Sequence, residues 1–168
     1  MKRLTWLVLA TMATLCCVTS AHAQRENTEV CFSVGPAFYD LSGTGTGIEL
    51  ATGFALRPTS RILVIEPGVS FFTYERDGGE RSRWLFYEVS FQAEGRAGQL
   101  RPYAGAGFGG GLETVGSDRQ SDLTLHLAGG TRIDFGDGYL VRAELRLRSV
   151  DPFTGSVAFL GFGFGWRF

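Results

Sequence analysis

The fold is decided by the last stretch of the chain, GSVAFLGFGFGWRF at residues 155–168. Aromatic side chains occupy every second position here, with small or charged residues between them: Phe162, Phe164, Trp166 and Phe168 alternate with Gly161, Gly163, Gly165 and Arg167. Because side chains alternate faces along a β-strand, one face of this segment is aromatic and the other is backbone and a charge. No later element follows to cover the aromatic face, so we expect lipid to cover it.

The first residues have the layout of a secretory signal. A basic start and an apolar run over 7–18 precede Ala21-His22-Ala23, a small-residue cleavage site. The run is too short to span a bilayer, and the cleavage site beside it argues against the alternative of a buried N-terminal helix. We therefore predict a signal peptide at 1–23 and an exported domain at 24–168.

Cys16 and Cys17 suggest the alternative that the chain is exported as a lipoprotein, with a lipid attached to the first mature cysteine. However, the bulky Leu15 directly before Cys16 fits lipoprotein processing badly. Cleavage after Ala23 removes both Cys16 and Cys17, which leaves Cys31 alone. We therefore expect no disulfide framework in the exported domain.

Composition narrows the class of protein. Apolar residues make up 44% of the chain, glycine occurs 24 times and the net charge is -1. After the signal, no stretch has the roughly 18 consecutive apolar residues of a membrane helix, so segments that cross lipid must be strands. The balanced charge also argues against a nucleic-acid partner, because no basic patch is present to neutralise phosphates.

Turn-type residues divide the exported domain at fairly even intervals. Clusters such as Asp77-Gly78-Gly79 and Gly136-Asp137-Gly138 separate segments long enough to cross the hydrocarbon layer as tilted strands. The eight segments lie near 30–40, 45–57, 61–75, 84–95, 100–113, 122–135, 139–150 and 155–168. No helix-period segment intervenes, so we predict an all-β fold, an eight-stranded antiparallel up-and-down transmembrane β-barrel.

Apolar and polar residues alternate along the predicted strands. The segment 139–150 shows the pattern clearly: Tyr139, Val141, Ala143, Leu145 and Leu147 alternate with Arg142, Glu144, Arg146 and Arg148. A transmembrane barrel has its apolar face outward, whereas a soluble sandwich or a periplasmic ligand-binding barrel would turn the same face inward. Glycines crowd the polar face and aromatics end the apolar faces like interfacial girdles, and both features favour the membrane barrel.

Two segments resemble the small outer-membrane barrels of the OmpA/OmpX type. Arg101-Pro102-Tyr103-Ala104-Gly105-Ala106-Gly107-Phe108-Gly109 is similar to their Pro-Tyr strand with alternating glycines, and Arg142-Ala143-Glu144-Leu145-Arg146 to their penultimate strand. Phe168, with Trp166 and Phe164 before it, resembles the C-terminal signal read by the outer-membrane assembly machinery. The resemblance implies an outer-membrane location, with this machinery and periplasmic chaperones as partners during biogenesis. The separate peptidoglycan-binding domain of full OmpA proteins is not expected.

The polar face predicts a charged lumen. An eight-stranded barrel has an interior just wide enough for its own side chains. The predicted lumen residues are Glu49, Glu66, Glu88, Glu94, Arg101, His126, Arg132, Asp134, Arg142, Glu144, Arg146 and Arg148. The acids lie mostly on the earlier strands and the bases on the later ones, so closure should pair them into a salt-bridged plug. The alternative is a narrow ion or water path between these charges, as in a small porin.

Catalysis has little support in the sequence. Lipid A-modifying acyl hydrolases need a serine beside a histidine that an acid orients. His126 is the only histidine of the exported domain, it shares the lumen face with Arg132 and Asp134, and the next residue on that face is Ala128. We therefore expect His126 to be a hydrogen-bonded member of the lumen network, and the chain not to be an enzyme. No His/Cys cluster has metal-ligand spacing, so no metal or cofactor is expected.

The loops complete the prediction. With both termini in the periplasm, short outside loops are expected near 41–44, 76–83, 114–121 and 151–154. Arginines in the second loop would suit the phosphates of lipopolysaccharide, whereas a specific adhesin usually offers longer loops. We expect a monomeric barrel with a structural or surface-interaction role, in contact with outer-membrane lipid and lipopolysaccharide.

Overall fold

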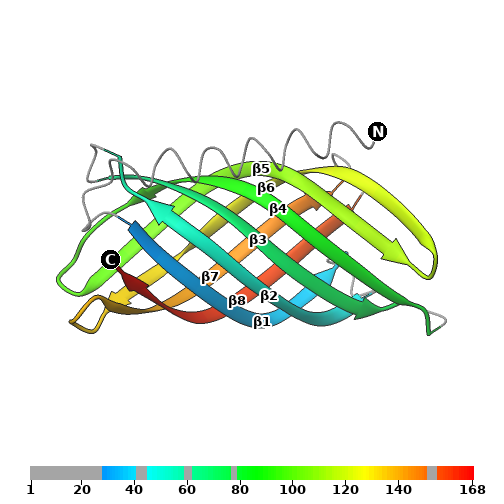
Figure 1. Cartoon of the computed structure of the whole chain (residues 1–168), viewed down its shortest axis with the longest axis horizontal. Helices are drawn as coiled ribbons and strands as arrows, with labels where there is room; N and C mark the ends of the chain where they lie inside the picture. Colours follow the sequence, from blue (N-terminus) through cyan, green and yellow to red (C-terminus); the bar gives the residue numbers. More distant parts are fainter. Residues whose placement is uncertain (1–27, 41–44, 59–61, 77–78, 151–154) are drawn as a thin grey trace.

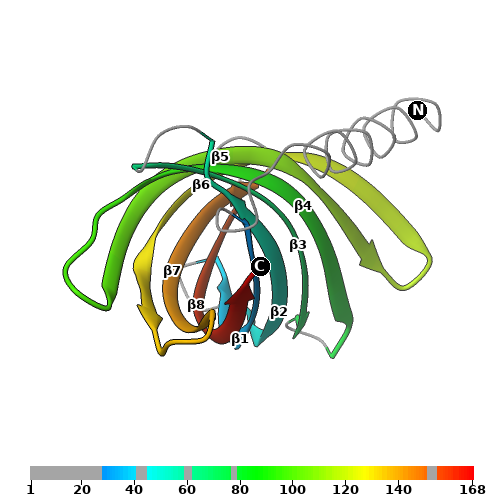
Figure 2. The same ribbon diagram turned by 60° about the vertical axis from the view of Figure 1, so that its left-hand side comes forward.

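The chain forms a closed β-barrel, seen from the side in Figure 1 and turned in Figure 2. The computed structural model describes residues 28–40, 45–58, 62–76, 79–150 and 155–168. Its strands are β1 (Thr28–Tyr39), β2 (Gly45–Leu56), β3 (Leu63–Glu75), β4 (Arg81–Glu94), β5 (Leu100–Val115), β6 (Asp118–Asp134), β7 (Tyr139–Val150) and β8 (Gly155–Arg167). The predicted eight-stranded antiparallel barrel is confirmed. The predicted signal peptide, 1–23, lies outside the described residues, in which no helix is long and apolar enough to cross a membrane.

Closure joins the first strand to the last. β1 and β8 are antiparallel, and their register places Val30 opposite Trp166 and Phe32 opposite Phe164. The Phe32 and Phe164 rings then meet on the outer face, with their centroids 5.9 Å apart. Each strand is hydrogen-bonded on both sides, so the barrel has no open sheet edge within lipid, where unpaired backbone groups would be costly.

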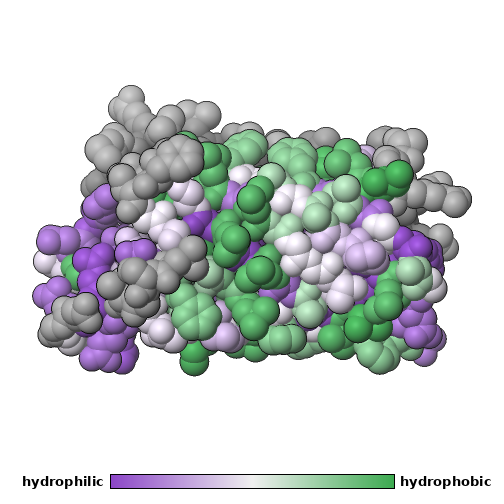
Figure 3. All heavy atoms as spheres, turned by 180° about the vertical axis from the view of Figure 1, so that it is seen from behind, coloured by the Kyte–Doolittle hydropathy of each residue, from purple (hydrophilic) through white to green (hydrophobic). Residues whose placement is uncertain are grey.

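The alternation along the strands places the predicted lumen charges inward and their apolar neighbours outward. Leu145 is 49% exposed and Phe164 60% exposed on the outer wall, whereas Arg148, on the opposite face, is only 2% exposed. Figure 3 shows hydrophobic residues over the middle of the wall and hydrophilic residues towards both ends of the barrel. This banded surface suits a hydrocarbon layer bounded by two polar interfaces.

The barrel has two distinct ends, a terminal end and a far end. The terminal end holds Thr28, Arg167 and the turn of β6–β7 near Gly136, and the far end holds the turn of β5–β6 at Gly116. Figure 1 shows the C-terminus at one end and the β5–β6 hairpin at the other.

At the far end, two loop predictions are wrong. β4 begins at Arg81 rather than at 84, and most of the predicted loop 114–121 is strand, because β5 continues to Val115 and β6 begins at Asp118. Only a tight turn separates them, with Gly116 in the left-handed region at φ 57°. Polar residues here resemble a loop, but outside lipid a β-ladder needs no apolar alternation to continue. The predicted loops 41–44 and 151–154 lie outside the described residues.

Candidate functional site

The lumen of the barrel is filled by side chains, and those towards the terminal end are mostly charged. Every predicted lumen residue points inward in the structure. The buried ones are Glu49, Glu66, Glu88, Glu94, Arg101, His126, Arg132, Arg142, Glu144, Arg146 and Arg148. Asp134 is half-buried, near the terminal rim. Together with Glu29, Arg57, Tyr103 and Arg167, these residues are called the ion network below.

At the terminal rim, Glu29 binds three arginines. It comes from the start of β1 and lies 2.8 Å from Arg57, 2.7 Å from Arg101 and 2.8 Å from Arg167. Arg101 also reaches Asp134 at 2.8 Å. Residues of β1, β5, β6 and β8 are thereby tied together where β1 begins and β8 ends.

One layer further in, Glu66 of β3 reaches across the lumen. Its two carboxylate oxygens accept hydrogen bonds from Arg132 at 2.5 Å and from Arg142 at 2.6 Å. Arg142 also pairs with Glu144, and Tyr103 donates its hydroxyl hydrogen to Glu144 at 2.7 Å. The Arg132 guanidinium lies over the Tyr103 ring, 4.2 Å from its centroid. This layer therefore joins β3 directly to β6 and β7.

Arg148 of β7 marks the inner limit of the network. It forms a two-pronged pair with Glu49 of β2, with both contacts at 2.8 Å, and reaches Glu88 of β4 at 2.9 Å. Its guanidinium also covers the ring of Phe86, 4.4 Å from the centroid. The bidentate geometry is the strongest kind of arginine–carboxylate contact.

Shared partners offset the cost of burying these charges. Removing a carboxylate or a guanidinium from water is expensive, and one attractive contact does not always repay it. Here most carboxylates have several partners: Glu94, for example, lies 2.6 Å from Arg132 and 3.2 Å from Arg101. Such a network stabilises the barrel only when it is complete, because losing one member leaves another charge buried and unpaired.

The far half of the lumen is filled differently. Inward-facing apolar side chains form a cluster called the aromatic plug below: Ala37, Phe72, Tyr74, Trp84, Phe86, Val150, Val157 and Phe159, with Tyr39 against it. Its rings stack in sequence, with centroids 4.9 Å apart for Tyr39 and Tyr74 and 5.3 Å apart for Trp84 and Phe86. Offset stacking of this kind adds to the burial energy of the rings.

The sequence prediction missed the aromatic plug. It assumed one polar face in each strand, but Phe71 and Phe72 are adjacent, so one of them must face inward. The continuous run Trp84-Leu85-Phe86-Tyr87 carries the same signal on β4. The prediction also left out Glu29 and Arg57, because both lie at or just beyond the limits of the predicted strands.

His126 lies beside a serine and a glutamate that the sequence did not bring together. Ser90 Oγ is 2.5 Å from His126 Nε2, and Glu88 Oε1 is 3.2 Å from His126 Nδ1. Ser90 is on β4 and His126 on β6, with Gly107 of β5 between them in the same row. A Cβ at Gly107 would overlap the His126 ring, so this glycine allows the histidine to lie across β5.

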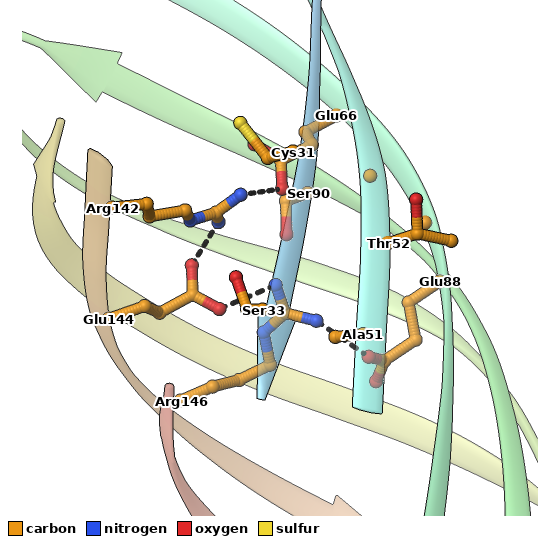
Figure 4. A pocket seen from close by; sticks show the side chains of 12 residues that line it. Cys31, Ser33, Ala51, Thr52, Glu66, Glu88, Ser90, Arg142, Glu144 and Arg146 are labelled. Atoms are coloured by element: carbon orange, nitrogen blue, oxygen red, sulfur yellow. Dashed lines mark hydrogen bonds and ion pairs between the residues drawn. The ribbon is translucent and has the colours of Figure 1, made fainter. Parts of the chain in front are cut away.

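A small cavity of about 10 Å³ lies beside Ser90 and has roughly the space of one water molecule. Figure 4 shows its lining, with Arg142 and Arg146 on one side and Glu88 on the other. Cys31 also lines it and is buried. Among the described residues, no group of three His, Cys, Asp or Glu side chains is placed to hold a metal ion.

The C-terminal aromatics lie on the outer wall. Phe164, Trp166 and Phe168 are 60%, 40% and 50% exposed, respectively. They form a row at the terminal end, away from the ion network. The structure thus places them where lipid or another protein can reach them.

Comparison with known proteins agrees with this architecture. The sequence model of the family described as "Outer membrane protein beta-barrel domain" matches residues 8–168. The fold is similar to that of Neisserial surface protein A, with a TM-score of 0.68 and 15% identity over 84% of this chain and 97% of that one. The N-terminal β-barrel domain of Pseudomonas aeruginosa OprF gives a TM-score of 0.56, with 18% identity over 86% of this chain and 100% of that one.

The outer membrane enzyme PagL is also similar, with a TM-score of 0.57 and 13% identity over 83% of this chain and 99% of that one. At these identities the structures show a shared fold, and fold alone does not assign activity. No curated protein sequence matches the chain significantly. The family match over nearly the whole length, together with the closed barrel and its apolar outer wall, shows that the chain belongs to the family of outer membrane proteins with a β-barrel domain.

Proposed function

We propose that this protein is a sealed outer-membrane barrel, with a structural or surface-interaction role rather than a conducting one. The observation that carries the proposal is the filling of both halves of the lumen. The ion network occupies the terminal half, and the aromatic plug occupies the far half. An ion crossing the barrel would have to displace paired arginines and then pass a stack of buried rings, with no room to keep its hydration shell.

Conductance separates this proposal from the narrow-channel alternative. The folded protein is inserted into planar lipid bilayers and the current is recorded over a range of voltages. A known porin inserted in the same way controls for insertion and sensitivity. We expect no regular current steps from this protein. Reproducible steps that scale with salt concentration would favour a narrow ion path between the lumen charges.

The Ser90, His126 and Glu88 group is assigned a structural role within this proposal. An acyl hydrolase that acts on membrane lipid needs its serine at a surface that the lipid can reach. Ser90 and His126 are buried in the lumen, and Glu88 is held by Arg148 and Arg146. We expect no labelling of the folded protein by a serine-directed fluorophosphonate probe. Labelling that Ser90→Ala abolishes would favour a hydrolase.

We also propose that Phe164, Trp166 and Phe168 form the signal for the outer-membrane assembly machinery. Their exposure at the terminal end supports this role, because a docking signal must be reachable. Deletion of Phe168 should lower the yield of folded protein in outer-membrane fractions. Replacement of the equally outward Phe108, which lies on β5, by alanine is the matched control and should leave the yield near that of the wild type.

A further inference from the structure

Two arginines lie in one cross-strand row on the outer wall at the far end. The ladder pairs Arg83 of β4 with Thr114 of β5, and Thr114 with Arg119 of β6. Both arginines are exposed. The neighbours of Arg83 on β4, Ser82 and Trp84, are buried in the lumen, so Arg83 points away from it. Arg119 lies on the same face, because both arginines are aligned with Thr114 across the ladder. The sequence prediction placed this region in loops, whereas the structure fixes it on rigid strands.

The spacing of this row suits one shared anion. Neighbouring strands are about 4.8 Å apart, so two arginines separated by one strand lie roughly 10 Å apart at the backbone. Long guanidinium side chains from both sides can converge over Thr114. Within the part of the chain that the structure describes, neither Arg83 nor Arg119 forms an ion pair.

Acidic residues near the row decide which arginines can bind an external anion, because an arginine that faces a carboxylate is already neutralised. Glu75 of β3 faces Arg81 across the ladder on the same outer wall, so Arg81 has a carboxylate opposite it. Glu113 faces the lumen and is already bound by Arg76 at 2.5 Å and by Ser82 at 2.6 Å. Two further acids near the row are exposed: Glu80, just before β4, and Asp118, at the β5–β6 turn. The free positive charge therefore lies at Arg83 and Arg119.

Next to this row, towards the middle of the barrel, the outer wall becomes apolar. The next outward row pairs Phe71 with Leu85 and Leu85 with Leu112. On β6 this row ends at Ser121, and Leu123, one outward position further along the strand, is apolar and 54% exposed. A ligand that touches both rows needs an anionic head and hydrocarbon chains. A free phosphate ion would use the arginines but not the apolar row beneath them.

We propose that Arg83 and Arg119 bind a phosphate group of a phosphorylated glycolipid in the outer leaflet, whose acyl chains lie on Phe71, Leu85 and Leu123. Arginine forks give strong, charge-assisted hydrogen bonds to phosphate oxygens. The site holds the barrel at a fixed depth and joins it to the surrounding lipid. This inference rests on the proposed function, because it requires the far end to face the outside of the cell.

The experiment measures how many glycolipid molecules the folded protein retains. Detergent-solubilised protein is mixed with bisphosphorylated lipid A and examined by native mass spectrometry, with enzymatically dephosphorylated lipid A as the second probe. The test variant is Arg83→Gln/Arg119→Gln. The matched control is Arg96→Gln, which removes an exposed arginine at the terminal end.

We expect about tenfold weaker retention of lipid A by the double variant, because it loses charge-assisted hydrogen bonds to phosphate. The Arg96→Gln variant should retain lipid A like the wild type, and dephosphorylated lipid A should bind all three proteins equally weakly. Equal retention by the wild type and the double variant would overturn the site. So would equal retention of the two probes, or full replacement of lipid A by inorganic phosphate or phosphatidylglycerol.

Two further measurements separate failure of this inference from failure of the proposed function. Unboiled and boiled samples of each variant are compared on gels, because a compact, faster-running unboiled band shows that the barrel has folded. Protease treatment of whole cells, with a cleavage site inserted at Gly116, tests whether the far end is outside. Cleavage together with unchanged lipid A retention by the double variant would reject the phosphate site alone.

Discussion

The two halves of the lumen exclude water by different physical means. In the terminal half, each buried charge is held by particular partners, as Glu66 is held by Arg132 and Arg142. In the far half, the aromatic plug fills space with stacked rings that have few polar atoms to satisfy. The first half depends on which groups meet, and the second depends mainly on volume. A conservative change should therefore be costly in the ion network and mild in the aromatic plug.

The halves are not independent, because Arg148 belongs to both. It pairs with Glu49 and Glu88 in the ion network, and its guanidinium covers the ring of Phe86 in the aromatic plug. A cation over an aromatic face in a desolvated site is attracted by the ring electrons. The charged and the apolar fillings are thus in direct contact at Arg148.

The largest effect is expected from Glu66→Gln, which keeps the shape of the side chain and removes its charge. Arg132 and Arg142 would then each lose a buried carboxylate, so the free energy of unfolding should fall by about 3–5 kcal/mol. Urea unfolding in lipid vesicles measures this change. Glu75→Gln, at an exposed acid of β3, is the matched control. A loss no larger than that of the control would show that the network does not depend on specific pairing.

The second largest effect is expected when an arginine is placed on the outer wall instead of in the lumen. Arginine is buried repeatedly inside, but Leu145→Arg places it against lipid near the middle of β7, where a cost of roughly 2–4 kcal/mol is expected. Tyr139→Arg, on the same face at the terminal end, should cost only about 0–1 kcal/mol because it lies near the interface. The same unfolding assay applies. Equal costs at the two positions would contradict the membrane-facing assignment of the wall.

A smaller effect is expected where a glycine lets one side chain cross a strand. A methyl group at Gly107 would overlap the Val89 carbonyl and the His126 ring, so Gly107→Ala should lower the unfolding free energy by about 1–3 kcal/mol. At Gly129, the nearest atom to an added Cβ is 3.8 Å away, which makes Gly129→Ala the control. If both variants unfold alike, the position of His126 across β5 is unimportant for stability.

The smallest effect is expected in the aromatic plug. Phe72→Leu keeps an apolar side chain of similar size, and such exchanges usually cost less than about 1.5 kcal/mol. Phe71→Leu, which changes the adjacent residue on the lipid side, serves as the control. A loss from Phe72→Leu as large as that from Glu66→Gln would remove the distinction between the two halves, because the plug would then depend on exact ring stacking.

Much of the fold could be predicted because its pattern is local. Period-two alternation placed Leu145 outward and Arg148 inward without knowledge of any partner strand. The prediction failed where that pattern ends. At 114–121 polar residues resemble a loop, and at Phe72 two adjacent aromatics obscure the face assignment, so the extended hairpin and the aromatic plug were both missed.

The sequence by itself determined the number of strands and most of their face assignments, since those depend on the spacing of residues along one strand. Tertiary structure alone decided which groups meet. Arg167 reaches Glu29 across 138 positions of sequence, and Ser90 reaches His126 over Gly107. Such contacts follow from register and closure, which couple all the strands at once, and no single strand carries that information.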